Sequence, residues 1–155
     1  MNINEIVVNK LIEKNYKIAT AESCTGGLLA SAIVEVANAS KVFDMSFVTY
    51  SNESKMELLG VSENLINVCG VVSEEVAMRM AYGAALKAKA NVGVGISGIA
   101  GPTGATATKP IGMVCFGFYV DGKSYCVTKY FGEIGRTNVR QASVAFVLEF
   151  LNSIL

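Results

Sequence analysis

The sequence predicts an α/β protein with a mixed five-stranded sheet in which one strand runs antiparallel to its neighbours. Its first half repeats a strand followed by a helix three times, a pattern typical of parallel strands joined by crossover helices. Residues 98–110 carry no helical pattern and so offer no crossover helix. We therefore expect the next strand, 113–120, to run antiparallel to its neighbour. Asp121-Gly122 then predicts a tight hairpin that returns strand 123–131 to the first direction.

The individual elements follow from apolar spacing and from helix-capping residues. The expected strands of the first half are residues 16–21, 45–50 and 92–97. The expected helices are residues 3–14, 28–36, 52–59, 62–68, 74–89 and 136–155. Ser51 and Ser73 are expected to cap their helices, and Gly60 to end one. Because residues 92–97 are apolar without alternation, we expect that strand to be buried on both faces.

The composition predicts one domain, residues 1–155, with a large core. Of the 155 residues, 52% are hydrophobic and 17% charged, and a chain of this length buries about two-thirds of its unfolded surface. The apolar excess predicts a homodimer or higher homo-oligomer. Equal numbers of basic and acidic residues, 13 each, argue against nucleic acid or an anionic membrane as main partner. With no membrane-spanning run and no signal-like start, we expect the cytoplasm.

The chain contains no histidine, which excludes Ser-His-Asp and Cys-His catalysis within one chain. The four cysteines are scattered without a CxxC pair, so we expect free thiols, with Cys115 and Cys126 as small core residues. Since zinc sites usually use histidine or clustered cysteine, no metal and no cofactor is predicted.

One polar stretch, residues 22–27 (ESCTGG), lies between the first strand and the second helix. Such a turn leaves helix N–H groups unpaired, and these attract negative charge. Ser23 is the candidate nucleophile, and the N–H groups of residues 24–26 would hold an oxyanion. The alternative is a turn that only caps the helix. Cys24 is a rival nucleophile, and Glu22 could either cap the strand end or orient substrate.

The strands that share a direction end at one edge of the sheet, where ligands of open α/β sheets bind. Polar segments gather there, and Lys55, one helical turn past the second strand, is the leading candidate base for Ser23. Its pKa would have to fall from about 10.4 to about 7–8, which burial can achieve. Tyr50 is predicted as the third catalytic member, relaying a proton or holding the Lys55 amine. The alternatives are a solvated helix lysine and a packed tyrosine.

The same edge supplies the predicted contacts to substrate. The glycine-rich loop 98–104 could cradle a phosphate or ribose, the alternative being a long ordered connection. Lys109, Arg136 and Arg140 are nearby cations that could meet a phosphate, although Arg140 could equally serve on the surface. The predicted substrate-binding residues are Thr25, Gly26, Gly27, Ser51, Asn52, Ser97, Gly98, Gly101, Lys109 and Arg136.

Six short blocks together make the chain resemble the CinA C-terminal-domain family, the stand-alone nicotinamide-nucleotide amidases. They are TAESCTGG (20–27), FVTYSNESK (47–55), GVVSEEVA (70–77), ISGIAGP (96–102), KPIG (109–112) and Arg136 with Val139-Arg140. The resemblance covers residues 6–151. It implies a three-layer α/β/α domain and hydrolysis of nicotinamide mononucleotide (NMN) to nicotinic acid mononucleotide and ammonia. It also implies a Ser/Lys amidase assisted by a tyrosine, with these roles on Ser23, Lys55 and Tyr50.

The sequence departs from the family pattern at three positions that concern substrate positioning. Ala105 replaces a usual glycine, Thr108 a usual acid, and Gly135 a usual acidic or amide residue. A non-catalytic nucleotide-binding module of the same fold is therefore the alternative function. A third hypothesis, an RNA-interaction domain, rests on similar layered folds that bind tRNA anticodons. The balanced charge disfavours it.

Overall fold

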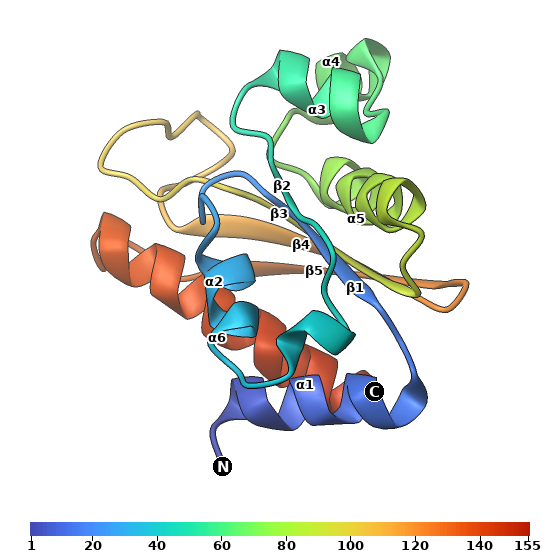
Figure 1. The fold of residues 1–155 in the computed structure, drawn as a ribbon. Helices are drawn as coiled ribbons and strands as arrows, with labels where there is room; N and C mark the ends of the chain where they lie inside the picture. The colour runs from blue at the N-terminus through green and yellow to red at the C-terminus, as the bar shows by residue number, and fades with distance from the viewer.

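The computed structural model describes residues 1–155 and shows a sheet between two layers of helices (Figure 1). The strands lie in the order β2-β1-β3-β4-β5. Their bounds are β1 (Ile18–Glu22), β2 (Phe47–Val48), β3 (Val92–Gly98), β4 (Met113–Val120) and β5 (Lys123–Tyr130). β1 pairs in parallel with β2 and β3, whereas β4 is antiparallel to both its neighbours. The predicted mixed five-stranded sheet with one antiparallel strand is confirmed.

The helices divide between the two faces of the sheet. They are α1 (Ile3–Lys14), α2 (Leu28–Val34), α3 (Asn52–Leu59), α4 (Glu63–Cys69), α5 (Glu74–Ala88) and α6 (Arg136–Ile154), with a short 3-10 helix η1 (Ala39–Lys41). α1, α2 and α6 cover one face, and α5 covers the other with α3 and α4 beyond it (Figure 1). This arrangement is the three-layer α/β/α architecture. No helix combines the length and apolar character needed to cross a membrane.

β3 is buried on both faces, as predicted, and the two faces are buried in different ways. Val92, Val94 and Ile96 pack in the large core against α1, α2 and α6. On the other face Gly93 and Gly95 have no side chain, so α5 lies directly on the strand backbone. A Cβ at these positions would come within 2.0 Å of the Ala81 carbonyl and 2.1 Å of the Ala77 carbonyl. The glycines of VGVGIS therefore permit the close approach of α5.

The predicted capping residues perform their roles. Ser51 Oγ accepts the Ser54 N–H at 3.1 Å and begins α3, while Ser73 Oγ accepts the Val76 N–H at 3.2 Å and begins α5. Gly60 ends α3 with a left-handed φ of +69°. Asp121 and Gly122, with φ of +47° and +89°, form the predicted hairpin between β4 and β5.

The second predicted strand, 45–50, is wrong in its extent, because only Phe47 and Val48 pair with β1. Ile18 of β1 bridges Phe43, and Ala21 of β1 pairs with Phe47. The segment 43–47 therefore advances four residues while β1 advances three, which leaves one extra residue on the β2 side. The extra residue breaks the ladder in the manner of a β-bulge. The chain therefore leaves β1 between these contacts and rejoins it next to the polar turn.

Other differences from the predictions are smaller. β1 spans 18–22 where 16–21 was expected, and α2 ends at Val34, two residues early. All four thiols are free, as predicted, and Cys115 is buried. The core placement of Cys126 is wrong, because β5 is an edge strand and exposes this residue, whose thiol donates to Glu74 at 3.5 Å.

Candidate active site

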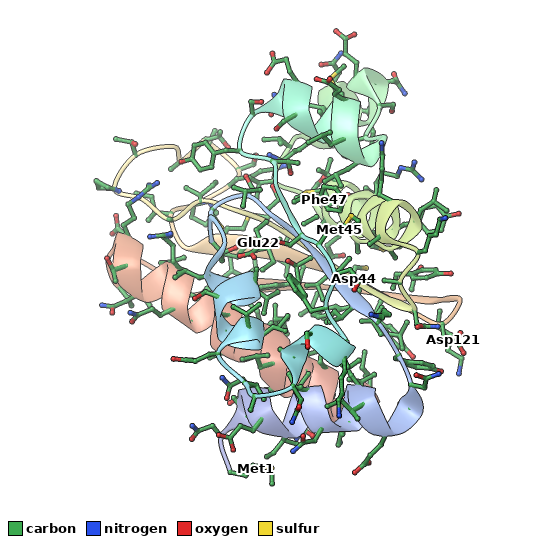
Figure 2. The ribbon with its side chains drawn as sticks, viewed as in Figure 1. Met1, Glu22, Asp44, Met45, Phe47 and Asp121 are labelled. Atoms are coloured by element: carbon green, nitrogen blue, oxygen red, sulfur yellow. The ribbon has the colours of Figure 1, made fainter.

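The turn between β1 and α2 is organised by the buried carboxylate of Glu22. This side chain has no exposed surface and lies where β1 meets α2 (Figure 2). Its oxygens accept the N–H groups of Leu29 and Ala30 at 3.0 and 2.9 Å. They also accept the Gly27 N–H at 3.2 Å and the Thr25 hydroxyl at 2.6 Å. Of the two roles left open by the sequence, Glu22 therefore takes that of a cap, on the helix that follows its strand.

The capping by Glu22 changes the expected anion site. The sequence assigned an oxyanion to the N–H groups of residues 24–26, but the Gly26 N–H donates to the Ser23 carbonyl at 3.1 Å. Glu22 supplies the negative charge that the start of α2 attracts. Within residues 23–27, only the N–H groups of Cys24 and Thr25 donate no hydrogen bond. The oxyanion donors are thus reduced to this pair.

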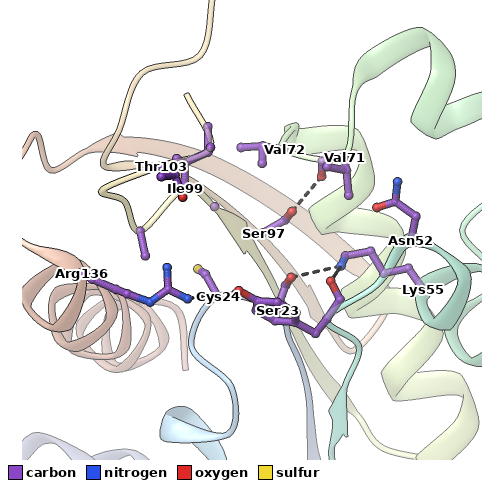
Figure 3. A pocket seen from close by; sticks show the side chains of 14 residues that line it. Ser23, Cys24, Asn52, Lys55, Val71, Val72, Ser97, Ile99, Thr103 and Arg136 are labelled. Atoms are coloured by element: carbon purple, nitrogen blue, oxygen red, sulfur yellow. Dashed lines mark hydrogen bonds between the residues drawn. The ribbon is translucent and has the colours of Figure 1, made fainter. Parts of the chain in front are cut away.

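Ser23 and Lys55 meet in the interior at this edge of the sheet, pointing toward each other from the turn after β1 and from α3 (Figure 3). The Lys55 amine lies 3.1 Å from the Ser23 hydroxyl oxygen. Ser23 is 9% exposed and Lys55 only 1%. A solvated helix lysine, the alternative for Lys55, does not fit this burial.

The remaining partners of the Lys55 amine are main-chain carbonyls. The amine donates to the carbonyl of Thr49 at 2.6 Å and to that of Tyr50 at 3.4 Å. A neutral amine has two N–H donors and one lone pair. With both donors directed at carbonyls, the lone pair is left for the Ser23 hydroxyl, which is the geometry that a general base requires.

Burial also favours the neutral form of this amine. Loss of hydration lowers the pKa of Lys55 from 10.5 to about 8. The ion pair of Lys17 with Asp44, which lies elsewhere, is the only one in the structure, so no carboxylate opposes this effect by pairing with Lys55. A base of this pKa is substantially neutral just above neutral pH.

Cys24, the rival nucleophile, is disfavoured by its surroundings. The residue is 6% exposed, and burial raises the pKa of its thiol to about 11. Since the thiolate is the reactive species, this raised pKa disfavours Cys24 as a nucleophile at neutral pH.

Tyr50 lies beside the pair in a different orientation from that predicted. Its side chain is 63% exposed, and its hydroxyl accepts a hydrogen bond from Arg136 at 3.1 Å. The phenol therefore does not hold the Lys55 amine, because the main-chain carbonyl of Tyr50 does so instead. The packed-tyrosine alternative is also wrong, since the residue is exposed and lines the cavity.

A cavity of about 320 Å³ opens over Ser23. Arg136 reaches toward it from α6, on the side opposite Lys55, and Asn52 and Thr103 lie on its rim (Figure 3). Val71 and Val72 form an apolar wall. The cavity lining brings together predicted residues from four separate segments, namely Ser23, Tyr50, Asn52, Lys55, Ser97, Gly98 and Arg136.

Two of the three predicted phosphate-binding cations are engaged elsewhere. The Lys109 amine donates to the carbonyls of Cys69 and Val72, and so holds the loop between α4 and α5. Arg140 donates to the carbonyls of Cys24 and Thr25 at 2.9 and 3.1 Å, which also excludes a purely surface role. Neither side chain lines the cavity. Arg136 is therefore the cation presented to a ligand there.

The remaining predicted binding residues support the site without lining it. Thr25 and Gly27 contact Glu22, Ser51 caps α3, and Gly26 lies next to Arg140. The Gly101 carbonyl oxygen accepts a hydrogen bond from Arg136 Nη1 at 2.9 Å.

Sequence reasoning missed three contributions to the site. Thr49 acts through its carbonyl, for which a sequence carries no signal. Val71 and Val72 belong to the GVVSEEVA block but look like ordinary core residues. Ser97, predicted to bind substrate, also donates to the Val71 carbonyl at 2.8 Å. The valine wall is therefore held in place by Ser97 and, through the Val72 carbonyl, by Lys109, both of which the sequence had indicated.

Fold and site define a class of protein: a three-layer α/β/α domain with a buried serine–lysine pair, without histidine, at the edge of its sheet. The family model described as the CinA C-terminal domain matches residues 1–155. The chain belongs to this family.

Relatives and solved structures agree with this assignment. A CinA-like protein from Kosmotoga olearia is 46% identical over 154 residues, covering 99% of this chain and 37% of that protein. One from Syntrophobacter fumaroxidans is 43% identical over 153 residues, covering 99% and 36%. The chain thus spans little more than a third of the length of these curated relatives.

Similar solved structures are matched over nearly their whole length. A CinA superfamily protein from Escherichia coli gives a TM-score of 0.96 at 35% identity, covering 99% of this chain and 89% of that one. The competence/damage inducible protein CihA from Agrobacterium tumefaciens gives 0.93 at 39% identity, covering 97% and 94%. None of these names states a reaction.

Proposed function

We propose that this chain is an amidohydrolase that converts NMN and water into nicotinic acid mononucleotide and ammonia. The single observation that supports it most is the Ser23 hydroxyl 3.1 Å from a buried lysine amine of lowered pKa. Activation of a serine by a neutral lysine is a known route to acyl transfer without histidine.

The first half of the reaction forms an acyl-enzyme. The neutral Lys55 amine takes the Ser23 proton while Ser23 Oγ attacks the carboxamide carbon. The oxyanion lies against the N–H of Cys24, the residue that follows the nucleophile and lines the cavity. The resulting Lys55 ammonium returns the proton to the amide nitrogen, and ammonia leaves as the C–N bond breaks.

The second half regenerates the enzyme. Water enters the place vacated by ammonia and gives a proton to Lys55 as its oxygen attacks the acyl carbon. The ester bond to Ser23 Oγ then breaks, and the proton returns to that oxygen from Lys55. The acid is released, and no metal is needed in this cycle.

The charge around the cavity supports an anionic substrate. Arg136 lines it and has no carboxylate partner, its bonds being to the Gly101 carbonyl and the Tyr50 hydroxyl. A phosphate offers a guanidinium a bidentate, charged acceptor that neither of these neutral oxygens provides. A cavity of about 320 Å³ accommodates a small ligand.

The test is ammonia release from NMN by the native protein and by Ser23→Ala. We expect release by the native protein and none above background by the variant. Undiminished release by Ser23→Ala would exclude Ser23 as nucleophile. Tight calorimetric binding of NMN without turnover by native protein would instead favour the non-catalytic nucleotide-binding module.

A further inference from the structure

Arg140 contacts the turn between β1 and α2, which carries Ser23, from a distant part of the chain. Its Nε donates to the Cys24 carbonyl at 2.9 Å and its Nη2 to the Thr25 carbonyl at 3.1 Å. Arg140 lies one helical turn after Arg136 on α6, so both side chains project from the same side of that helix. Only Arg136 lines the cavity. Arg140 therefore acts on the turn and not on a ligand.

The hydrogen bonds of the turn show which peptide depends on Arg140. The Ser23 carbonyl is held by the Gly26 N–H at 3.1 Å, and the Thr25 carbonyl also accepts the Leu28 N–H at 3.0 Å. The Cys24 carbonyl accepts from Arg140 alone. Of the three peptides that link Ser23 to Gly26, the one that joins Cys24 to Thr25 is thus the only one whose carbonyl has no local donor.

That peptide lies immediately beyond the N–H group proposed to hold the oxyanion. In a planar trans peptide the C=O and the N–H point in opposite directions. Fixing the Cys24 carbonyl toward α6 therefore fixes the Thr25 N–H away from it. The Cys24 N–H belongs to the preceding peptide, whose Ser23 carbonyl accepts the Gly26 N–H. The local bond from Gly26 therefore directs the Cys24 N–H, and Arg140 directs the Thr25 N–H.

The fit between the turn and this guanidinium is close. Gly26 has a φ of +56°, and a Cβ there would lie 3.3 Å from Arg140 Nη2. Arg140 has no carboxylate partner. Its charge is therefore directed entirely at the two carbonyls of the turn.

We propose that Arg140 is a positioning residue that fixes the peptide after Cys24, and thereby directs the Thr25 N–H, one of the two available oxyanion donors, and holds the turn that carries Ser23. This proposal rests on the proposed Ser23 chemistry but not on the identity of the substrate. A misplacement of about 1 Å, or the loss of one oxyanion donor, costs roughly 100-fold in rate.

The test measures covalent labelling of Ser23 by a fluorophosphonate, followed by intact mass. Ser23 Oγ bonds to phosphorus, fluoride leaves, and the serine proton passes to Lys55, so the rate reports attack without any natural substrate. We expect Arg140→Ala to react about 100-fold more slowly than the native protein. Methylguanidinium should restore at least about tenfold of this loss, and methylammonium should not.

Arg79→Ala is the matched control. Arg79 also donates through Nε to a main-chain carbonyl, that of Gly60 at 3.0 Å, and neither residue lines the cavity. Its labelling rate should stay within about twofold of the native rate. If Arg140→Ala does not fold, Arg140→Lys replaces it and should react about tenfold more slowly, because an ammonium does not reproduce the two-carbonyl fork.

Labelling of Arg140→Ala within threefold of native, or a loss that methylguanidinium does not reverse, would overturn the positioning role. So would native protein that is not labelled at Ser23. Ammonia release from NMN is measured on the same samples. Native protein that is labelled but releases no ammonia would end the NMN proposal and leave the positioning role standing.

Discussion

The two sides of the cavity differ in how their polar groups are held. On the buried side, Ser23, Lys55 and Glu22 are each less than 10% exposed, and main-chain groups hold Lys55 and Glu22. On the rim, Tyr50 and Arg136 are exposed, and their side chains contact each other. The groups proposed for chemistry are thus fixed before a ligand arrives, whereas the groups proposed for binding can exchange partners. Changes on the buried side should affect stability and turnover, and changes on the rim should affect affinity.

The largest expected effect on stability is that of Glu22→Ala. This change leaves the N–H groups of Gly27, Leu29 and Ala30 without their acceptor. Several buried donors lost together should lower the free energy of unfolding by about 4 kcal/mol, measured by urea denaturation. Glu63→Ala, on the exposed first turn of α4, is the control and should change it by less than about 0.5 kcal/mol. A cost below about 1 kcal/mol for Glu22→Ala would show that the cap is dispensable.

The lowered pKa of Lys55 should make stability depend on pH. Between about 8 and 10.5 the unfolded chain binds a proton that the folded chain does not. Stability attributable to this residue should therefore rise as pH increases through that window, by roughly 2–3 kcal/mol. Comparing urea denaturation of native protein and Lys55→Met at pH 7.5 and 10 isolates this contribution. Parallel pH dependences in the two proteins would mean that Lys55 titrates normally.

On the rim, Arg136→Met should weaken binding and leave turnover nearly intact. Loss of the cavity-lining guanidinium should raise the KM for NMN by about 10- to 30-fold, with kcat within about threefold of native. The matched substrate is the nucleoside without its phosphate, whose kcat/KM should hardly change. Equal losses on both substrates would place the phosphate away from Arg136.

The smallest effect is expected for Tyr50→Phe. Its hydroxyl contacts Arg136, and its carbonyl, which holds Lys55, is kept in the variant. We expect kcat within about fivefold of native in the ammonia assay, since the phenol has no contact with the Ser23–Lys55 pair. A loss of about 100-fold would instead assign the phenol a proton-transfer role, as the family resemblance implies.

The sequence predicted the topology because its signals were local. Asp121-Gly122 fixed the hairpin, and the missing helix in 98–110 fixed the antiparallel strand. It also placed Ser23 and Lys55 at one edge, since parallel strands of one sheet end together. It left Glu22 open between a strand-end cap and substrate orientation, because whether a carboxylate turns into the following helix or toward the cavity depends on tertiary packing.

The cations show the same limit. Lys109, Arg136 and Arg140 were all candidates to meet a phosphate, yet the side chains of Lys109 and Arg140 donate only to main-chain carbonyls, and only Arg136 lines the cavity. The carbonyls that accept these bonds lie in loops or at the end of α4, and whether such a carbonyl lacks a nearby N–H donor depends on the folded conformation of the loop. The bulge near β2 was likewise missed, because a single extra residue leaves the apolar pattern of residues 45–50 unchanged.

The most direct test of the Ser23–Lys55 pair is the pH dependence of kcat/KM with NMN, which reports the ionisation of the free enzyme. We predict a limb that rises with unit slope to a plateau, with a midpoint near pH 8, the pKa at which burial sets the Lys55 amine. Lys55→Met should show no such limb and residual activity lower by about 1,000-fold or more. A native profile that is flat from pH 6 to about 10, or a variant with the same rising limb, would contradict a neutral Lys55 as the base.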